Sequence, residues 1–308
     1  MIQKGTVPFC IIFISYICTQ KDYLMQYRKI DLKDYVQIGE GGNGKTYEKP
    51  SEPDLILKVN KRGLNTLEFV KKEYDVSKAV ESLGIKVPKM YEIVEVADGY
   101  GTLSQRIKDK KSLSRICHDE PERLEEMAWI LCEKGKELAS TPCDTDFFPS
   151  RKQQVLKGIE ITRFISKKYR RIIRNFAETI PENDNCVHGD FQFGNIIQSG
   201  DEYYVIDLDR FAHGDFMFDV GHLYQICNVY ASMKQVQEIF HMTYEQFKAS
   251  WNAFAKAYTG KEDHSEFDHL AGKFACLDLV VRPVFQETSL PQKIFFSIHI
   301  KRLVKQFF

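Results

Sequence analysis

Residues 187–195 read Val-His-Gly-Asp-Phe-Gln-Phe-Gly-Asn, and this stretch decides the fold. Within it, Asp190 is followed five residues later by Asn195. A carboxylate at the first position can accept or orient the proton of an attacking hydroxyl. An amide oxygen at the second position can bind Mg²⁺ without adding charge beside that carboxylate. The spacing is typical of a loop that transfers phosphoryl groups.

A second acidic group follows this loop at the end of a predicted strand. The run 203–206 is apolar and leads directly into Asp207. We expect the Asp207 carboxylate to bind a Mg²⁺ ion that bridges the phosphates of a nucleotide. Asp209, two residues further on, is the alternative ligand.

The letters of the loop recur at residues 213–216, which read His-Gly-Asp-Phe. Five residues after Asp215 stands Val220 rather than an asparagine, so a metal ligand is missing. This second copy is predicted to be a connecting turn.

A glycine cluster at residues 39–46, GEGGNGKT, fits two nucleotide-binding patterns. It matches the G-x-G-x-x-G pattern of kinase glycine-rich loops and the G-x-x-x-x-G-K-[ST] pattern of P-loops. Both patterns use glycine so that the main chain can approach phosphate closely. The glycines expected to contact the nucleotide are Gly39, Gly41, Gly42 and Gly44.

The residues after the cluster favour the first pattern. A P-loop opens a helix, but residues 47–53 contain two prolines and no apolar stripe. We expect the chain to turn and return as the strand 55–59, with Lys45 in the loop. The alternative, a P-loop nucleotide hydrolase, would make Lys45 and Thr46 essential.

Lys58 lies inside the apolar strand 55–59. Such a lysine either extends to solvent at a sheet edge or contacts the α- and β-phosphates of ATP. The second role requires an acidic partner. On the predicted helix 67–83, Glu73 is the best candidate and Glu68 the second.

The order of elements indicates an α+β, two-lobed organisation. Residues from about 30 to 107 carry strand-like runs, including 35–38 and 91–96, around the helix 67–83. From about residue 108 the chain is mainly helical, with long candidates at 121–139 and 151–180. We therefore predict a small β-rich N-lobe at 25–107 and a larger, mainly helical C-lobe at 108–308.

The first 24 residues are predicted to be a leader that is either not translated or disordered. The apolar run 7–18 is too short for a comfortable membrane span and no cleavage site of the small-x-small type follows it. Translation from Met25 is our hypothesis. An added strand or a membrane anchor is the alternative.

The composition limits the partners. Lys plus Arg and Asp plus Glu both number 43 in 308 residues, so no whole-molecule field attracts nucleic acid or an acidic membrane. The eight cysteines are scattered and form no C-x-x-C pair, which indicates a reducing compartment. We expect a cytoplasmic protein that binds neither nucleic acid nor membrane.

The pattern H-G-D-x-x-x-x-N followed by Ile-Asp resembles the aminoglycoside phosphotransferase and choline kinase group, which shares the protein-kinase-like fold. The resemblance covers roughly residues 35–225. It implies an ATP- and Mg²⁺-dependent phosphotransferase with two lobes.

For the nucleotide, the resemblance implies that residues 39–44 cover ATP, Lys58 contacts its phosphates and Glu73 fixes Lys58. A hinge would lie against adenine, formed by Ser104, Gln105, Arg106 and Ile107. For the chemistry, it implies that Asp190 is the catalytic base and that Asn195 and Asp207 bind the metal. His188 and Asp219 would brace the loop.

Three features bear on the acceptor. Gly189 replaces the arginine of the H-R-D motif and no A-P-E motif follows Asp207, which favours a hydroxyl of a small molecule over a protein acceptor. A protein kinase and a nucleotide-binding pseudokinase remain alternatives. Whether the acceptor is aminoglycoside-, choline- or sugar-like is left open.

Two charged segments are further candidates for the acceptor site. A cationic acceptor needs acidic or aromatic walls, and Glu262, Asp263, Glu266 and Asp268 lie near Trp251 and Tyr258 in sequence. The basic segment 151–174 could serve an anionic acceptor or nucleic acid. For both segments the competing interpretation is a solvated helix face.

Overall fold

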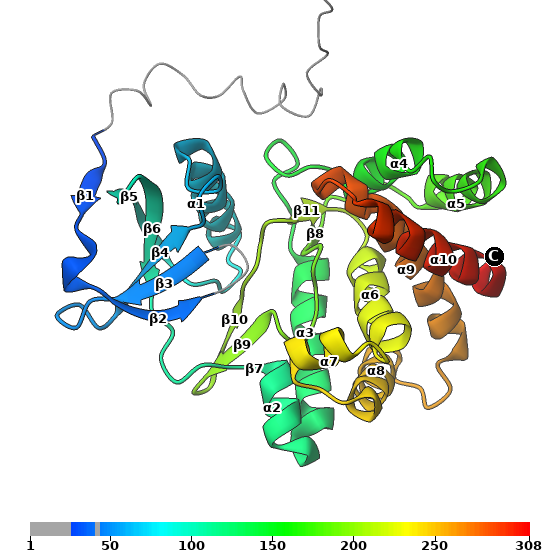
Figure 1. Cartoon of the computed structure of the whole chain (residues 1–308). Helices are drawn as coiled ribbons and strands as arrows, with labels where there is room; N and C mark the ends of the chain where they lie inside the picture. Colours follow the sequence, from blue (N-terminus) through cyan, green and yellow to red (C-terminus); the bar gives the residue numbers. More distant parts are fainter. Residues whose placement is uncertain (1–25, 41–43) are drawn as a thin grey trace, which may run out of the picture. The chain divides into compact units, whose positions relative to one another are not determined.

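The computed structural model describes residues 26–40 and 44–308 (Figure 1). These residues form two compact units, which are described separately: a sheet unit, 26–71 (apart from 41–43) with 91–104, and a helical unit, 72–90 with 105–308. The predictions for residues 1–24, Met25, Gly41 and Gly42 lie outside the described residues.

The sheet unit is built on six strands in the order β1-β5-β6-β4-β3-β2. The strands are β1 Arg28–Ile30, β2 Val36–Glu40, β3 Gly44–Glu48, β4 Leu55–Asn60, β5 Met90–Val96 and β6 Gly99–Gln105. A short 3₁₀ helix, η3 Leu32–Asp34, precedes β2. Side chains two residues apart point to one face of a strand, so Val94 and Val96 of β5 join Leu57 and Leu103 in a buried cluster.

The described residues of the glycine cluster belong to two strands, with Gly39 and Glu40 at the end of β2 and residues 44–46 at the start of β3. These strands pair antiparallel, with Gly39 opposite Thr46, and β3 also pairs with β4. A Cβ at Gly44 would overlap the main chain of β4, so only glycine allows this approach. Two expectations are wrong here: the returning strand is β3 rather than 55–59, and Lys45 lies in that strand rather than in a loop. The cause is that β3 is stabilised by pairing on both sides, which its polar sequence does not reveal.

The hairpin also contradicts the P-loop alternative. A P-loop needs a helix directly after its last glycine, because the helix N-terminus holds the phosphates. Gly44 instead begins strand β3.

Helix α1, Leu67–Ser82, matches the helix predicted at 67–83. Gly84, with φ of +84°, follows its end and can adopt the left-handed conformation that terminates helices. Val80, together with Ile85 and Val87 after the helix, is buried in the core of the helical unit. The division between the two units therefore falls within α1.

Most buried apolar residues of the helical unit form one hydrophobic core, and Ile107, Ile197 and Tyr204 form a smaller cluster. Its α-helices are α2 Leu113–Asp119, α3 Leu124–Ser140, α4 Arg151–Ile161, α5 Lys167–Thr179, α6 Met217–Tyr224, α7 Lys234–Phe240, α8 Tyr244–Thr259, α9 Ser265–Phe285 and α10 Leu290–Phe307. A 3₁₀ turn, η4 Pro121–Arg123, leads into α3, and a π-helix, η5 Gln225–Tyr230, continues α6. Helices α6 and α4 both pack against α9.

The single helix predicted at 151–180 is two helices, α4 and α5. Helix α4 ends at Ile161 and the buried Thr162 follows it. Ser166, the residue before α5, accepts a hydrogen bond from the main-chain N–H of Tyr169. Serine at this position offers the main chain a cap in place of a continued helix. The apolar periodicity is nearly unbroken across the gap, so it did not reveal the break.

Five short strands surround the loop 188–195, called the catalytic loop after its predicted role. They are β7 Lys111–Ser112, β8 Cys186–Val187, β9 Ile196–Ser199, β10 Glu202–Val205 and β11 Ala212–His213. Strand β8 enters the loop and β9 leaves it; β9 pairs with β10 and β8 with β11. After β11, the Asp215 carboxylate accepts a hydrogen bond from the N–H of Met217 at the start of α6, so the second His-Gly-Asp-Phe is the predicted connecting turn.

The predicted fold class, α+β with a small β-rich lobe and a larger helical lobe, is confirmed. Within residues 26–40 and 44–308, none of the helices has the length and apolar character needed to cross a bilayer.

Candidate functional site

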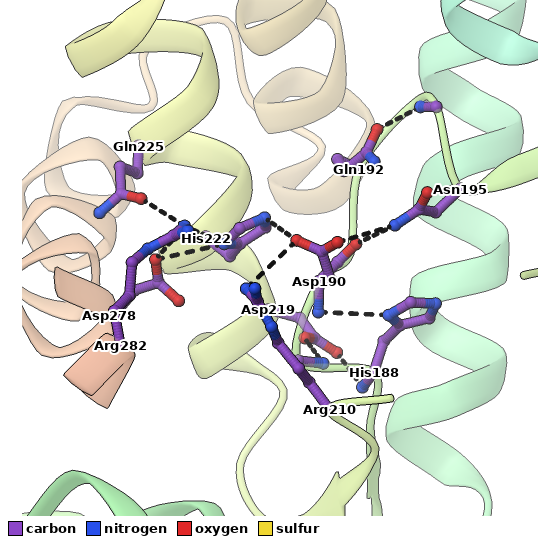
Figure 2. A network of polar contacts seen from close by, with 12 residues as sticks. His188, Asp190, Gln192, Asn195, Arg210, Asp219, His222, Gln225, Asp278 and Arg282 are labelled. Atoms are coloured by element: carbon purple, nitrogen blue, oxygen red, sulfur yellow. Dashed lines mark hydrogen bonds and ion pairs between the residues drawn. The ribbon is translucent and has the colours of Figure 1, made fainter. Parts of the chain in front are cut away.

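Asp219 of α6 holds the first residues of the catalytic loop in place (Figure 2). Its two carboxylate oxygens accept hydrogen bonds from the main-chain N–H groups of His188 and Gly189, each at 2.7 Å. Burial raises the pKa of Asp219, whereas the two donors favour its ionised form. Asp219 thus has the bracing contacts that the family resemblance implies.

Gly189 is required by its own geometry. Its φ is +82°, and a Cβ there would overlap the guanidinium of Arg151 and the carbonyl oxygen of Arg210. Arg151, from α4, is buried and donates to that carbonyl. Arg151 of α4 therefore fills the space that a side chain at position 189 would need.

His188 connects the loop to the end of β10. Its Nδ1 accepts the main-chain N–H of Asp190 at 3.2 Å, and its Nε2 lies 2.9 Å from the carbonyl oxygen of Ile206. Since Nδ1 accepts, Nε2 carries the proton and donates to Ile206. The ring is buried and positions the loop without facing solvent.

Asp190 has both carboxylate oxygens in contact with other side chains (Figure 2). Oδ2 lies 3.2 Å from Nδ2 of Asn195, while Oδ1 lies 2.8 Å from Nε2 of His222 and 3.8 Å from Nη1 of Arg210. Burial alone would raise the pKa of Asp190, but His222 and Arg210 outweigh it and hold the pKa well below its usual range. The side chain is a quarter exposed, so the ionised carboxylate can still be reached by an acceptor.

Asn195 and Asp207 lie at the same end of the β9–β10 hairpin. The carbonyl of Asn195 accepts the N–H of Ile206 at 3.0 Å, and Asp207 is the next residue. Nδ2 of Asn195 donates to the main chain of Asp190 at 2.9 Å, which leaves its Oδ1 for a cation. Asp207 is exposed and has a φ of +67°.

These two residues fit Mg²⁺. This ion is commonly bound through one or two protein oxygens, with waters and substrate phosphates completing its octahedron. Across the described ranges, no group of three or more His, Cys, Asp or Glu side chains could hold a metal alone. Asn195 and Asp207 are suited to a metal that arrives with a nucleotide.

The predicted nucleotide residues are divided between the two units. Lys58 is half-buried on β4, opposite Thr46, in the sheet unit. Glu73 is half-buried on α1, in the part assigned to the helical unit. Gly39 and Gly44 flank the hairpin. The pairing of Lys58 with Glu73 and their contact with phosphates stay predictions.

The predicted hinge links the two units. Ser104 and Gln105 end β6, and the main-chain N–H of Gln105 donates to the carbonyl of Lys89 at 2.8 Å. Ile107 is buried against Ile197 of β9 and Tyr204 of β10. Its contact with adenine, and that of Arg106, stay predictions.

Of the acidic and aromatic candidates for a cationic acceptor, Glu262, Asp263 and Glu266 are exposed, while Trp251 belongs to the core. Trp251 is buried, stacks on Phe267 and donates from Nε1 to Asp268 at 2.8 Å. His264 contacts the same carboxylate at 2.9 Å. Asp268 and Trp251 are therefore already paired with each other.

A basic groove of about 750 Å³ lies along α4 and α5. It is lined by Ile159, Glu160, Arg163, Lys167, Arg170, Arg171 and Arg174. These residues belong to the basic segment 151–174, the predicted candidate for an anionic acceptor, and none of them lies in the catalytic loop.

Sequence reasoning missed the groups that hold Asp190 from the helical side. They are Arg210, His222, Gln225, Asp278 and Arg282 (Figure 2). One signal was available: His222 follows Asp219 by three residues in an otherwise apolar segment, where a titratable side chain needs a partner. No sequence signal pointed from His222 to Asp278, because that contact depends on how α6 packs on α9.

The fold and the loop geometry together define a kinase-like phosphotransferase. The sequence pattern of the phosphotransferase enzyme family matches residues 34–253, and the chain belongs to this family. The predicted resemblance and the predicted enzyme class, a phosphotransferase with an alcohol group as acceptor, are confirmed at the level of the family.

Solved structures share the fold at low identity. A choline/ethanolamine kinase family protein from Mesorhizobium loti is 11% identical, with a TM-score of 0.53, covering 88% of this chain and 87% of its own. ADP-bound aminoglycoside phosphotransferase APH(2'')-Ib is 17% identical, with a TM-score of 0.55 and coverages of 91% and 92%.

A third is a thermostable mutant of aminoglycoside phosphotransferase APH(4)-Ia in a ternary complex with ADP and hygromycin B. It is 14% identical, with a TM-score of 0.54 and coverages of 89% and 94%. No curated protein sequence matches the chain.

Proposed function

We propose that the protein transfers the γ-phosphoryl group of ATP to a hydroxyl of a small molecule, with Mg²⁺ as the metal. One observation carries the proposal: the Asp190 carboxylate contacts the Asn195 amide at 3.2 Å, and the main chain ties Asn195 to the residue before Asp207. A base and two oxygen ligands thus lie together, as phosphoryl transfer requires. This arrangement also speaks against a pseudokinase.

In this proposal Asp190 orients the acceptor hydroxyl and receives its proton. Asn195 and Asp207 would hold Mg²⁺, which neutralises charge on the phosphates. Lys58, fixed by Glu73, contacts the α- and β-phosphates, and the glycine hairpin covers them. The glycine-rich nucleotide loop belongs to the lobe predicted at 25–107, with residues 104–107 against adenine. The catalytic loop and the acceptor site belong to the lobe predicted at 108–308.

The family supports a small-molecule acceptor, and structures of similar fold contain ADP, in one case with hygromycin B. We further propose a cytoplasmic location. Six cysteines of the described part of the chain are free thiols, which suits a reducing compartment.

The test is a screen for Mg²⁺-dependent consumption of ATP against aminoglycosides, choline-like amines, sugars and nucleosides, with the phosphorylated product identified by mass spectrometry. Asp190→Ala should lower turnover by roughly 10²–10⁴-fold, since a positioned acid–base group is lost. Asp215→Ala is the matched control, because it removes the aspartate of the second His-Gly-Asp-Phe and should leave turnover nearly unchanged.

A second arm of the screen compares metal ligands. Asp207→Ala should abolish Mg²⁺-dependent binding of ATP in calorimetry, whereas Asp209→Ala should retain it. Product formation by Asp190→Ala at the wild-type rate would contradict the catalytic assignment. The reverse pattern for the other two variants would move the metal ligand to Asp209.

A further inference from the structure

His222 bridges two carboxylates in the interior of the helical unit (Figure 2). It lies on α6 and is buried. Its Nε2 is 2.8 Å from Oδ1 of Asp190, and its Nδ1 is 3.2 Å from Oδ2 of Asp278 on α9. One ring therefore joins the catalytic loop to a helix that contributes nothing else to the predicted site.

The contacts continue beyond Asp278. Nη2 of Arg282, one turn further along α9, lies 3.0 Å from the same oxygen of Asp278. It also donates to Oε1 of Gln225 at 2.9 Å. The result is a charged chain, Asp190–His222–Asp278–Arg282, in which His222 is buried while the side chains of Asp278 and Arg282 are 10% and 18% exposed. Nη2 of Arg282 also lies 3.3 Å from Nδ1 of His222, so both cations meet at Asp278.

The surroundings of His222 favour its charged form. Burial alone would lower the pKa of His222, but the charges of Asp278 and Asp190 outweigh it and raise the pKa to about 9. Other charged or titratable groups that act on the chain are His188 of the loop, Asp209 and Arg210 after β10, Arg151 of α4 and Tyr230 of η5. A neutral ring would leave the partly buried carboxylates of Asp190 and Asp278 with less compensation.

We propose that His222 is a positioning residue for the catalytic carboxylate: its imidazolium, held in place by Asp278 and Arg282, fixes Oδ1 of Asp190 so that the carboxylate faces the acceptor hydroxyl. The inference rests on the proposed function of Asp190. His222 acts through Asp190 and performs no chemistry of its own.

His222 positions Asp190 mainly through its charge and less through its packing. Although Nε2 is 2.8 Å from Oδ1, its N–H is not aligned for a hydrogen bond. Glutamine at this position would keep a donor of similar reach but would lose the charge. His222→Gln therefore separates an electrostatic role from a packing role.

The first measurement needs no acceptor. In the wild-type protein with ¹⁵N-labelled histidine, the imidazole resonances should show that the His222 ring stays protonated through pH 7 and titrates near pH 9. Asp278→Asn should move that titration to lower pH. A ring that titrates near its ordinary value in the wild type would overturn the inference.

The second measurement is kinetic. With the acceptor found in the screen, or with water as the acceptor, His222→Gln should lower kcat by roughly 10–100-fold and change the KM for Mg²⁺-ATP by less than about twofold. His264→Gln is the matched control, since it removes another His–Asp pair of the helical unit without touching Asp190. It should keep the wild-type kcat.

The outcomes separate the two proposals. Normal kcat in His222→Gln would contradict this inference alone, while absence of turnover in the wild type would contradict the proposed function. Should His222→Gln fail to fold, Asp278→Asn takes its place, with the same expected loss of kcat at pH 8. Normal kcat in Asp278→Asn at that pH would likewise overturn the inference.

Discussion

At the residue scale, the catalytic loop depends on one glycine as much as on its polar side chains. Gly189 combines a positive φ with the close approach of Arg151, so any side chain there meets both backbone strain and overlap. Gly200, in the turn between β9 and β10, also has a positive φ, of +58°, but open space around it.

This pair of glycines gives the first prediction. Gly200→Ala should cost about 1 kcal/mol of unfolding free energy, from the left-handed conformation alone. Gly189→Ala should cost roughly 2–5 kcal/mol, because the overlap with Arg151 adds to that strain. Urea denaturation of both variants measures the difference. Equal losses would mean that Arg151 and the main chain at Arg210 move aside at no cost.

Much of the site at this scale could be predicted from the sequence, because Asp190, Asn195 and His188 lie within one short loop whose spacing is itself the signal. Arg151, His222 and Asp278 could not be predicted. They come from three different helices, and only tertiary packing brings them to the loop.

At the element scale, helix α6 reaches the loop because it packs closely on α9. A Cβ at Gly221 would lie 2.5 Å from the main-chain carbon of Phe274. The absence of a side chain at Gly221 lets the two helices approach, and His222 beside it then meets Asp278. The sequence shows a glycine inside a helix but not the neighbour that requires it.

The second prediction concerns this contact. In an exposed helix, glycine to alanine would stabilise by up to about 1 kcal/mol. For Gly221→Ala we expect a net loss of roughly 1–3 kcal/mol, since overpacking against α9 outweighs the gain in helix propensity. Thermal unfolding gives the sign of the change in stability. The pH at which His222 titrates should also differ from that in the wild type. A stabilised variant would show that α6 and α9 tolerate a methyl group between them.

The dependence on tertiary contacts also explains which elements were predicted correctly. Helix α1 and strands β4 and β5 carry their own apolar periodicity and were predicted to within a few residues. Strand β3 was missed since its stability comes from two partners, and the break between α4 and α5 was missed since a cap, rather than a change of periodicity, makes it.

At the scale of the whole molecule, the buried charges should make stability depend on pH in two windows. Asp190 and Asp278 have lowered pKa values, so their contribution is present above their ordinary value of 3.8 and is lost as the pH falls below it. His222 has a raised pKa, so its contribution is complete below its ordinary 6.5 and is lost as the pH rises toward about 9.

The third prediction follows from the alkaline window. Between pH 6 and pH 9 the wild-type protein should lose up to about 3 kcal/mol of unfolding free energy through His222, by linkage of its raised pKa to folding. His222→Gln should lack this loss, while His264→Gln should retain it.

His299, whose pKa burial lowers, acts in the opposite direction but equally in all three proteins, so it cancels from the comparison. Urea denaturation at both pH values provides the free energies. If His222→Gln lost as much unfolding free energy between pH 6 and pH 9 as the wild type, the His222 ring would be neutral in the folded protein. The contacts from Asp190 to Arg282 would then have to be assigned with His222 as an uncharged bridge.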